Sequence, residues 1–295
     1  MTVGPSDNST SGGSLGGAPT ARRMVLGAQL RRLREAAGIS RADAGYRIRS
    51  SESKMSRIEL GRVGFKERDV ADLLTMYGVD DPAEREAFLE MVKQSSQPGW
   101  WQRYSDVIPG WFNNYVGLEE SASRIQTYEL QFVPGLLQTE DYAAAVVGHG
   151  GAKSGESVER RLDLRLRRQK NLTRPDAPRL WAVIDESVLY RPIGGPSVLK
   201  AQLDALLELS SQPNVSLQIL TYAKSGYAAE GSFSMLRFAE SELPTVVFVE
   251  HLTGGMYLDS LEDVEAYGRA LDRLAVDAET PEVSRQLISK RRTEI

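Results

Sequence analysis

The segment Ile39–Gly61, ISRADAGYRIRSSESKMSRIELG, decides the fold of the N-terminal part of the chain. It contains two short helical stretches, and each follows a serine, Ser40 or Ser51, whose side chain can cap the free N–H groups of a first helical turn. Gly45 provides the small residue that the first helix needs where the second helix approaches closely. These features predict a helix-turn-helix, in which two helices are joined by a turn of about three or four residues.

The second helix of this pair is predicted to have one apolar and one polar face. Ile58 faces the core of the domain, as do Met55 one turn before it and Ile48 in the turn. A helix of this size fits the major groove of B-DNA, where its N-terminal residues meet base edges. On the polar face, Arg57 can donate to guanine O6 and N7, and Glu52 can accept from a cytosine amino group.

Phosphate contacts are expected at the start of the first helix, where Ser40 and Arg41 lie beside the positive end of the helix dipole. The alternative is a helical domain whose basic face is merely solvated, which the agreement of spacing, caps and charge disfavours. The residues predicted to contact DNA are Ser40, Arg41, Glu52, Ser53, Lys54, Ser56, Arg57 and Arg62.

Charge is distributed unevenly along the chain. Residues 21–66 hold 12 Lys and Arg against 4 Asp and Glu, a net charge of +8, whereas the whole chain of 295 residues has a net charge of −4. The remainder of the chain therefore carries −12 and would repel phosphate. This asymmetry predicts that nucleic acid is contacted at the N-terminal end of the chain alone.

Composition and periodicity divide the chain into a tail and two domains. Residues 1–20 are rich in Gly, Ser and Thr and poor in apolar residues, so we expect a disordered tail. Residues 21–95 contain several short amphipathic helices and form a small all-helical DNA-binding domain. The linker Ser95–Gly99 leads into a regulatory or partner-binding domain at residues 100–290.

The second domain is predicted to be α+β, with helices around a mainly antiparallel sheet. Its clearest strand is 215–220, where apolar Val, Leu and Ile alternate with Ser and Gln as in a half-buried strand. Further strands are expected at 180–184, 233–238, 246–249 and 256–258. Helices are expected at 118–130, 140–147, 156–172 and 198–209, and from Leu261 and Pro281 onward.

Residues for catalysis or metal binding are scarce. The absence of cysteine excludes disulfides, zinc–thiolate sites, iron–sulfur clusters and cysteine nucleophiles, and the two histidines are His149 and His251. There is neither a nucleophile elbow nor a phosphate-binding loop with lysine. We therefore predict no catalytic residue, no metal and no cofactor. An enzyme stays an alternative, because Asp185 and Glu186 at a strand end and Glu250 beside His251 can meet in a site.

The location of the protein is predicted from what the sequence lacks. No apolar run reaches the ~18 residues of a membrane span, and the N-terminal segment has no apolar core of a secretory signal. A chain without cysteine also fits a reducing compartment. We expect a cytoplasmic protein that does not contact a membrane.

Two features of the second domain are candidates for binding a partner. One is an aromatic cluster that follows the linker, and the other is the basic amphipathic helix around residues 160–170. The competing interpretation, which we favour for both, is a hydrophobic plug that seats the linker and a helix paired with acidic neighbours. The candidate partner-binding residues are Trp100, Trp101, Tyr104, Arg165 and Arg168.

The N-terminal domain resembles a known family. The segments LGAQLRRLREAAGIS and MSRIELGR are similar to the lambda-repressor-like, or xenobiotic-response-element type, helix-turn-helix domains, and the similarity covers roughly residues 26–79. It implies a transcriptional regulator that binds DNA sequence-specifically. Two positions depart from the family's usual pattern, Ala44 in place of a large aliphatic residue and Arg49 in place of a glycine in the turn. An arginine in a left-handed conformation there would cost about 1 kcal/mol.

The second domain also carries a resemblance. As a set, YELQFVPGLLQTEDYA, LRLRRQ, LWAVIDESVL, GGPSVL, NVSLQIL and VEHLTGGMYLD are similar to an uncharacterised domain attached to many such regulators. The similarity covers about residues 99–288. Some members are described as antitoxin-like regulators that are encoded beside a small partner protein, and the resemblance therefore implies a regulatory role.

Three hypotheses follow for the function. The first is a sequence-specific regulator whose C-terminal domain binds a small protein partner or an effector. We expect it to bind an inverted repeat in double-stranded DNA as a homodimer, because typical affinity requires two half-sites, and to bind a small acidic protein from a neighbouring gene. The second is an enzyme in the C-terminal domain that the N-terminal domain directs to DNA. The third is an antitoxin-like module that neutralises a small protein and regulates its own synthesis.

Overall fold

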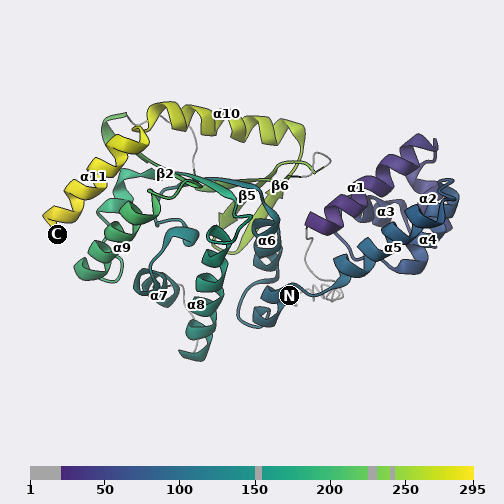
Figure 1. Cartoon of the computed structure of the whole chain (residues 1–295), viewed down its shortest axis with the longest axis horizontal. Helices are drawn as coiled ribbons and strands as arrows, with labels where there is room; N and C mark the ends of the chain where they lie inside the picture. The colour runs from purple at the N-terminus through teal and green to yellow at the C-terminus, as the bar shows by residue number, and fades with distance from the viewer. Residues whose placement is uncertain (1–20, 150–154, 225–230, 240–242) are drawn as a thin grey trace, which may run out of the picture. The chain divides into compact units, whose positions relative to one another are not determined.

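A computed structural model describes residues 21–149, 155–224, 231–239 and 243–295 of the chain (Figure 1). The chain divides into two compact units, Met1–Pro98 and Gly99–Ile295, and each is described by itself. The predicted tail at residues 1–20 lies outside the described residues.

The described part of the first unit is all-helical. Its helices are α1 (Ala21–Ala36), α2 (Arg41–Arg47), α3 (Glu52–Glu59), α4 (Glu67–Met76) and α5 (Pro82–Ser96). Three of them begin at a side-chain cap: the side chains of Ser40, Ser51 and Asp81 accept from backbone N–H groups in the first turns of α2, α3 and α5. The caps explain why so many short helices are well defined in a segment of this length.

The core of the first unit forms where α1 approaches the end of α3. A Cβ atom on Gly27 would lie 2.5 Å from the carbonyl oxygen of Glu59, and one on Gly61 would lie 2.6 Å from the backbone nitrogen of Met24. Both glycines are therefore required for this backbone contact, which fixes α3 against α1. The buried side chains of this core include Leu26, Leu30, Ile48, Met55, Ile58, Val70, Leu73, Leu74 and Phe88.

The second unit places helices around a sheet. Its strands are β1 (Arg124–Glu129), β2 (Arg179–Asp185), β3 (Val215–Leu220), β4 (Phe233–Arg237), β5 (Val246–His251) and β6 (Gly254–Leu258). Its helices are α6 (Gly110–Ser121), α7 (Glu140–His149), α8 (Gly155–Gln169), α9 (Pro196–Leu209), α10 (Leu261–Asp277) and α11 (Pro281–Glu294). Short 3₁₀ helices lie at Trp100–Tyr104, Gly135–Leu137, Lys170–Leu172, Glu186–Leu189 and Tyr222–Lys224.

The sheet is mixed. The strand order in the described residues is β3-β2-β1-β4-β5-β6, with β1, β2 and β3 parallel to one another and the pairs β1–β4, β4–β5 and β5–β6 antiparallel. The α+β class predicted from the sequence is confirmed. The parallel pairings show that the antiparallel character is less dominant than expected.

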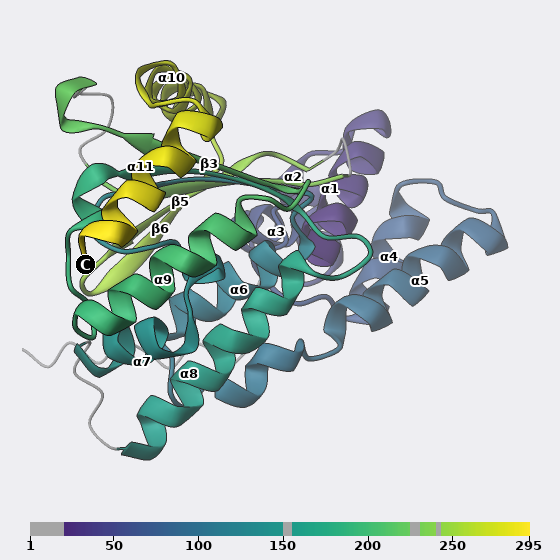
Figure 2. The same ribbon diagram turned by 60° about the vertical axis from the view of Figure 1, so that its left-hand side comes forward.

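Helices cover both faces of this sheet. α10 packs on one face, where Leu271 and Leu274 join a core with Tyr128, Val183 and Met235. α6, α7, α8 and α9 lie on the opposite face (Figures 1 and 2). The sheet is therefore the middle layer of three.

One predicted helix is wrong. The segment 118–130 was expected to be helical, but α6 ends at Ser121 and residues Arg124–Glu129 form β1, a central strand of the sheet. Ile125 and Thr127 face one side of the sheet, whereas Tyr128 joins the core under α10. This alternation of β-branched and aromatic residues is typical of a strand. Burial on both faces masks the hydrophobic pattern in the sequence.

Candidate nucleic-acid interface

The turn between α2 and α3 is held by backbone contacts around Gly45. The Ser50 N–H donates to the Gly45 carbonyl at 2.8 Å, and a Cβ atom on Gly45 would lie 3.0 Å from the Ser50 carbonyl oxygen. This contact is tighter than side chains normally make, so a larger residue would push the turn away from α2. The predicted need for a small residue at this position is confirmed.

The turn also contains a strained residue. Arg49 has a φ of +54°, the one positive value at a non-glycine position in the part of the chain that the structure describes. Its N–H donates to the Tyr46 carbonyl at 3.0 Å, which closes the end of α2. The left-handed conformation inferred from the family pattern is thus present, and its cost is about 1 kcal/mol.

α3 has the orientation predicted from the sequence. Met55 and Ile58 are buried in the core, whereas Glu52, Ser53 and Arg57 are exposed. The remaining residues predicted to contact DNA are Ser40 and Arg62, which are exposed, and Arg41, Lys54 and Ser56, which are partly buried. The structure therefore places this set at the N-terminal ends of α2 and α3 and on the outer face of α3, except for Arg62, which follows the C-terminal end of α3.

A buried ion pair joins α1 to α3. Arg34 Nε donates to Glu59 Oε1 at 2.5 Å and Arg34 Nη2 donates to Glu59 Oε2 at 3.2 Å. The two side chains are only 7% and 2% exposed. The hydrogen bond with Glu59 raises the pKa of Arg34, so the guanidinium stays charged although it is buried. The bidentate contact locks the last turn of α3 against α1.

The same carboxylate also anchors a residue of the predicted interface. Arg41 Nε donates to Glu59 Oε2 at 3.1 Å, and the Arg41 side chain is 38% exposed. A guanidinium has further N–H donors beyond this contact, so Arg41 can hold a phosphate while Glu59 positions it. The sequence offers one signal for this role: Glu59 lies four residues after Met55 on the core face, where a carboxylate requires a cationic partner.

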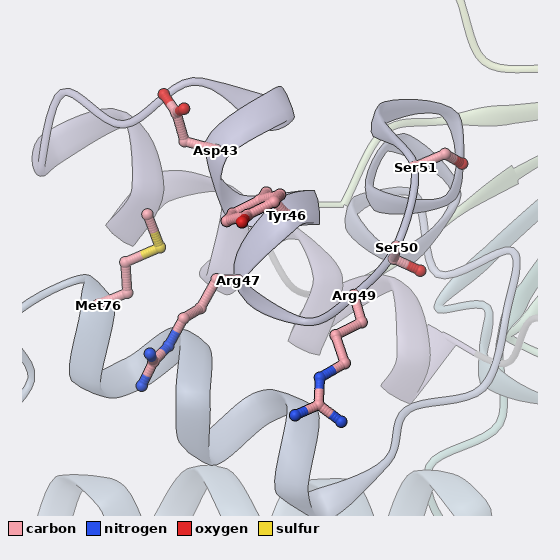
Figure 3. Close-up of a pocket in the computed structure, with 7 residues that line it drawn as sticks. All are labelled: Asp43, Tyr46, Arg47, Arg49, Ser50, Ser51 and Met76. Carbon is pink, nitrogen blue, oxygen red and sulfur yellow. The ribbon is translucent and has the colours of Figure 1, made fainter.

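A surface hollow of about 780 Å³ lies beside the turn (Figure 3). Its lining residues are Asp43, Tyr46, Arg47, Arg49, Ser50, Ser51 and Met76. Tyr46 is 86% exposed, and Arg47 pairs with Asp72 at 3.5 Å. The hollow places two guanidinium groups and serine hydroxyls beside the cap of α3, and such groups commonly bind phosphate. Arg47 and Arg49 are candidate contacts that sequence reasoning missed, although both lie in the basic stretch YRIRSS.

The aromatic cluster of the second unit is internal. Trp101 and Tyr104 are buried, in a small core with Val116 and Leu164. Trp100 is partly buried, with the guanidinium of Arg167 4.6 Å from its ring centroid. These side chains hold α8 against the start of the second unit. Their burial supports the structural interpretation of the cluster over a partner platform.

The arginines of α8 are also engaged inside the second unit. Arg168 is buried and donates to both carboxylate oxygens of Glu119, from Nε at 2.8 Å and from Nη2 at 2.7 Å. Burial lowers the pKa of Arg168, but the charge and hydrogen bonds of Glu119 outweigh it and raise the pKa above its ordinary value. Arg165 Nη1 donates to Gln138 Oε1 at 2.6 Å. Like the aromatic cluster, these candidate partner-binding residues have structural contacts.

Ionisable groups gather at the carboxyl end of β1. Burial raises the pKa of Glu129 to about 7 and lowers the pKa of Arg165 to about 10. Beside them is a cavity of about 30 Å³ whose lining includes Thr127, Arg168 and Ser234. This volume suits about one water molecule. The cluster therefore makes Glu129 sensitive to pH near neutrality.

Asp185 and Glu186, the carboxylates considered for catalysis, both accept hydrogen bonds from backbone N–H groups. Asp185 Oδ1 accepts from the Ser187 N–H at 2.9 Å and caps a 3₁₀ helix. Glu186 Oε2 accepts from the Tyr222 N–H at 2.9 Å. His251 lies exposed at the end of β5. No described contact links it to Asp185 or Glu186.

Two features are absent from the residues that the structure describes. No group of three or more His, Asp or Glu residues is placed to hold a metal ion there. No helix among the described residues combines the length and the apolar character needed to cross a membrane.

Comparison with known families agrees with this geometry. A family described as a helix-turn-helix domain matches residues 25–88, so the first unit defines a DNA-binding protein of the helix-turn-helix class. A family described as a domain of unknown function, DUF5753, matches residues 112–290, more than half of the chain, and the chain belongs to this family. Searches of curated proteins and of solved structures returned no match.

Proposed function

We propose that this protein is a sequence-specific transcriptional regulator of the lambda-repressor-like type, acting in the cytoplasm. The observation that carries the proposal is the fixed orientation of α3. Met55 and Ile58 hold its inner face in the core, whereas Glu52, Ser53 and Arg57 stand exposed on the outer face. A helix held in this way can present ordered side chains to base edges in the major groove.

The exposed residues divide into two roles in this proposal. Arg57 contacts a guanine and Glu52 a cytosine, and these contacts supply sequence selectivity. Ser40, Arg41 and Arg62 contact the sugar–phosphate backbone and set the register of α3 in the groove, together with Lys54 and Ser56 beside it. The net charge of +8 over residues 21–66 supports this assignment, because it concentrates the attraction to phosphate on one unit.

Two copies of the chain bind one operator in this proposal. A single helix-turn-helix contacts a small stretch of DNA, and specific affinity usually needs two half-sites about one helical turn apart. A homodimer on an inverted repeat meets this need, because the two-fold symmetry of the protein then matches that of the DNA.

The second unit senses a signal, in our proposal, and does not catalyse a reaction. Asp185 and Glu186, the carboxylates considered for catalysis, serve as acceptors for backbone N–H groups. The resemblance to antitoxin-like regulators favours a small protein from a neighbouring gene as the signal. The acidic character expected of this partner calls for a basic docking surface. Because Arg165 and Arg168 of α8 are engaged internally, we place that surface outside α8.

Selection from random double-stranded DNA by the full-length protein tests the proposed function. We expect enrichment of an inverted repeat whose half-site centres are about 10 base pairs apart. The apparent affinity should fall steeply with salt, because phosphate contacts release counterions. Recovery of no common sequence, with binding that depends on salt alone, would contradict a sequence-specific regulator.

A further inference from the structure

The two edge strands of the sheet in the second unit, β3 and β6, differ in how far other segments cover them. At the β3 edge, Ile219 donates its N–H to Ser284 Oγ at 2.8 Å and accepts from the Glu279 N–H at 2.9 Å, so α11 and the segment before it cover the strand. At the β6 edge, none of the residues of Gly254–Leu258 is buried. Among the described residues β6 is the last strand on this side of the sheet, and such an edge strand is a template for pairing with another strand.

Exposed apolar side chains accompany the open edge. Leu252 in the turn before β6 is 102% exposed, Met256 in the middle of β6 is 44% exposed, and Leu261 at the start of α10 is 75% exposed. Leu252 precedes Met256 by four residues and Leu261 follows it by five. The three residues are thus spread almost evenly along the sequence about Met256. Grouped apolar exposure of this kind marks an interaction surface.

The register of the hairpin determines which backbone groups of β6 face the outer edge of the sheet. His251 pairs with Gly254 across a two-residue turn. In such hairpins the pair that flanks the turn is hydrogen-bonded, and hydrogen-bonded pairs then alternate along the strands. Counting from this pair, Gly255 and Tyr257 direct their backbone N–H and C=O groups to the open edge, with Met256 between them. This arrangement is symmetric about Met256.

We propose that β6 pairs with β6 of a second copy of the chain, antiparallel, about a two-fold axis between the two Met256 residues. Gly255 of one copy lies opposite Tyr257 of the other, so the outward backbone groups of both strands find partners. Leu252 of each copy approaches Leu261 of the other, and the two Met256 side chains meet at the axis. All the exposed apolar groups of this edge are covered by one self-complementary contact.

The pairing also keeps like charges apart. Three carboxylates, Asp259, Glu262 and Asp263, follow β6, whereas Glu250 alone directly precedes the turn His251–Gly254, which itself contains none. In the antiparallel arrangement, the acidic start of α10 from one copy lies beside the carboxylate-free turn of the other, which bears a histidine. Charge complementarity therefore favours a second copy aligned about this axis over a parallel alignment that stacks the acidic segments.

The interface is small, and this links it to DNA binding. Each strand in this pairing has five residues. The surface area that such a pairing buries is small compared with the roughly 1,200–2,000 Å² buried in stable complexes. The free protein should therefore dimerise weakly, and an operator that holds two copies should strengthen the pairing by the same factor by which dimerisation strengthens DNA binding. This last point rests on the proposed function, whereas the pairing itself does not.

A single-cysteine variant tests the axis directly, since the full-length chain has no cysteine of its own. Antiparallel residues in a non-hydrogen-bonded pair have Cα atoms about 4.5 Å apart, within the range that a disulfide spans. Mild oxidation of Met256→Cys should yield mainly covalent dimer on a non-reducing gel. The control Val276→Cys, at an 81% exposed position of α10, should stay mainly monomeric.

A charge variant gives a second, non-covalent test. Met256→Lys places two ammonium groups at the axis, and sedimentation equilibrium should show dimerisation weakened by at least about tenfold. Val276→Lys is the matched control and should dimerise as the unmodified protein does. Operator binding by all variants is measured in parallel.

The outcomes separate the pairing from the proposed function. Equal cross-linking of Met256→Cys and Val276→Cys would overturn the pairing, as would an unmodified protein that is monomeric at about 100 µM both free and on an inverted repeat. A β6 edge occupied by a strand of another protein would overturn it as well. A dimer that Met256→Lys abolishes, in a protein without DNA selectivity, would refute the proposed function and leave the pairing standing.

Discussion

Helices α3 and α8 are both amphipathic and both contain arginine, yet the structure uses these arginines in opposite ways. In α8, Arg168 is buried against Glu119 and Arg165 donates to Gln138. In α3, Arg57 is exposed, and the structure gives it no ion pair among the described residues. Of the two carboxylates in α3, Glu52 is exposed and Glu59 faces inward to Arg34.

The difference teaches where to look for a nucleic-acid interface. A basic helix contacts DNA only when its cations are left exposed by the fold, and this depends on where the acidic partners lie. In the first unit the acidic partner is on the buried face of α3 and holds the helix in place. In the second unit the acidic residue is Glu119. It binds Arg168 of α8, the arginine that the sequence suggested for contact with another protein.

The largest expected effect comes from removing the buried carboxylate of α3. Glu59→Ala leaves Arg34 buried without its partner, and breaking a buried pair in this way costs about 3–5 kcal/mol. We expect the first unit to unfold at much lower denaturant concentration. All four tryptophans, Trp100, Trp101, Trp111 and Trp181, lie in the second unit. Circular dichroism compared with tryptophan fluorescence therefore assigns the loss to the first unit.

Glu35→Ala is the matched control for this comparison. Glu35 also pairs with Arg34, at 3.3 Å, but its side chain is 51% exposed. Exposed pairs contribute less than about 1 kcal/mol, so this variant should unfold almost as the unmodified protein does. Equal losses in the two variants would show that α3 is not held by the buried contact.

A smaller effect is expected from the ionisable cluster of the second unit. Burial raises the pKa of Glu129 from 4.5 to about 7, against a weaker opposing effect of its hydrogen bond with Ser232; Glu250 raises it further and Arg165 lowers it. The folded state therefore binds a proton that the unfolded state releases between these pH values. The contribution of Glu129 to the free energy of unfolding is present at pH 4.5 and is lost as pH rises through 7.

Glu129→Gln removes this dependence, because the amide is neutral throughout. Relative to the unmodified protein, the variant should gain up to about 2 kcal/mol in free energy of unfolding between pH 5 and pH 8. Tryptophan fluorescence during urea unfolding measures the difference. The exposed Glu208→Gln serves as the control and should show no such trend. A difference between Glu129→Gln and the unmodified protein that stays constant with pH would contradict a protonated Glu129 in the folded state.

The smallest expected effect is at the turn. Arg49→Gly relieves the left-handed backbone at φ +54° and should stabilise the first unit by about 1 kcal/mol, offset in part by the greater freedom of glycine in the unfolded chain. Thermal unfolding followed by circular dichroism measures this gain. If Arg49 also contacts phosphate from the hollow beside the turn, the variant loses affinity for all DNA sequences alike. Loss of selectivity for one base pair would instead assign Arg49 to base contact.

The helix-turn-helix was predictable because its signals are local. The caps Ser40 and Ser51 and the close approach at Gly45 act within a few residues, so their spacing carries the geometry. The contact between Arg34 and Glu59 was not found, since it joins residues 25 positions apart and resembles ordinary surface charge in the sequence. The only sign of this contact in the sequence is the position of Glu59 on the core face of α3.

In the second unit, the described strands β2 to β6 lie where the sequence predicts strands, and β1 is the exception. β3 alternates apolar and polar residues, and the sequence shows it plainly. β1 is central and buried on both faces, so Gln126 and Thr127 occupy positions that periodicity alone assigns to a helix. The pairing of β1 with β2 and β4 depends on residues more than 50 positions away, and no local pattern records that pairing.

The most direct test of the account is the sequence selectivity of Arg57→Ala in the full-length protein. Binding to the selected operator and to operators changed at each position should show a loss of about 1–3 kcal/mol of discrimination at one base pair of each half-site. Lys93→Ala, an exposed cation on α5, should leave discrimination unchanged. If a folded Arg57→Ala protein discriminates among operators as the unmodified protein does, α3 does not read the DNA through the face that the structure exposes.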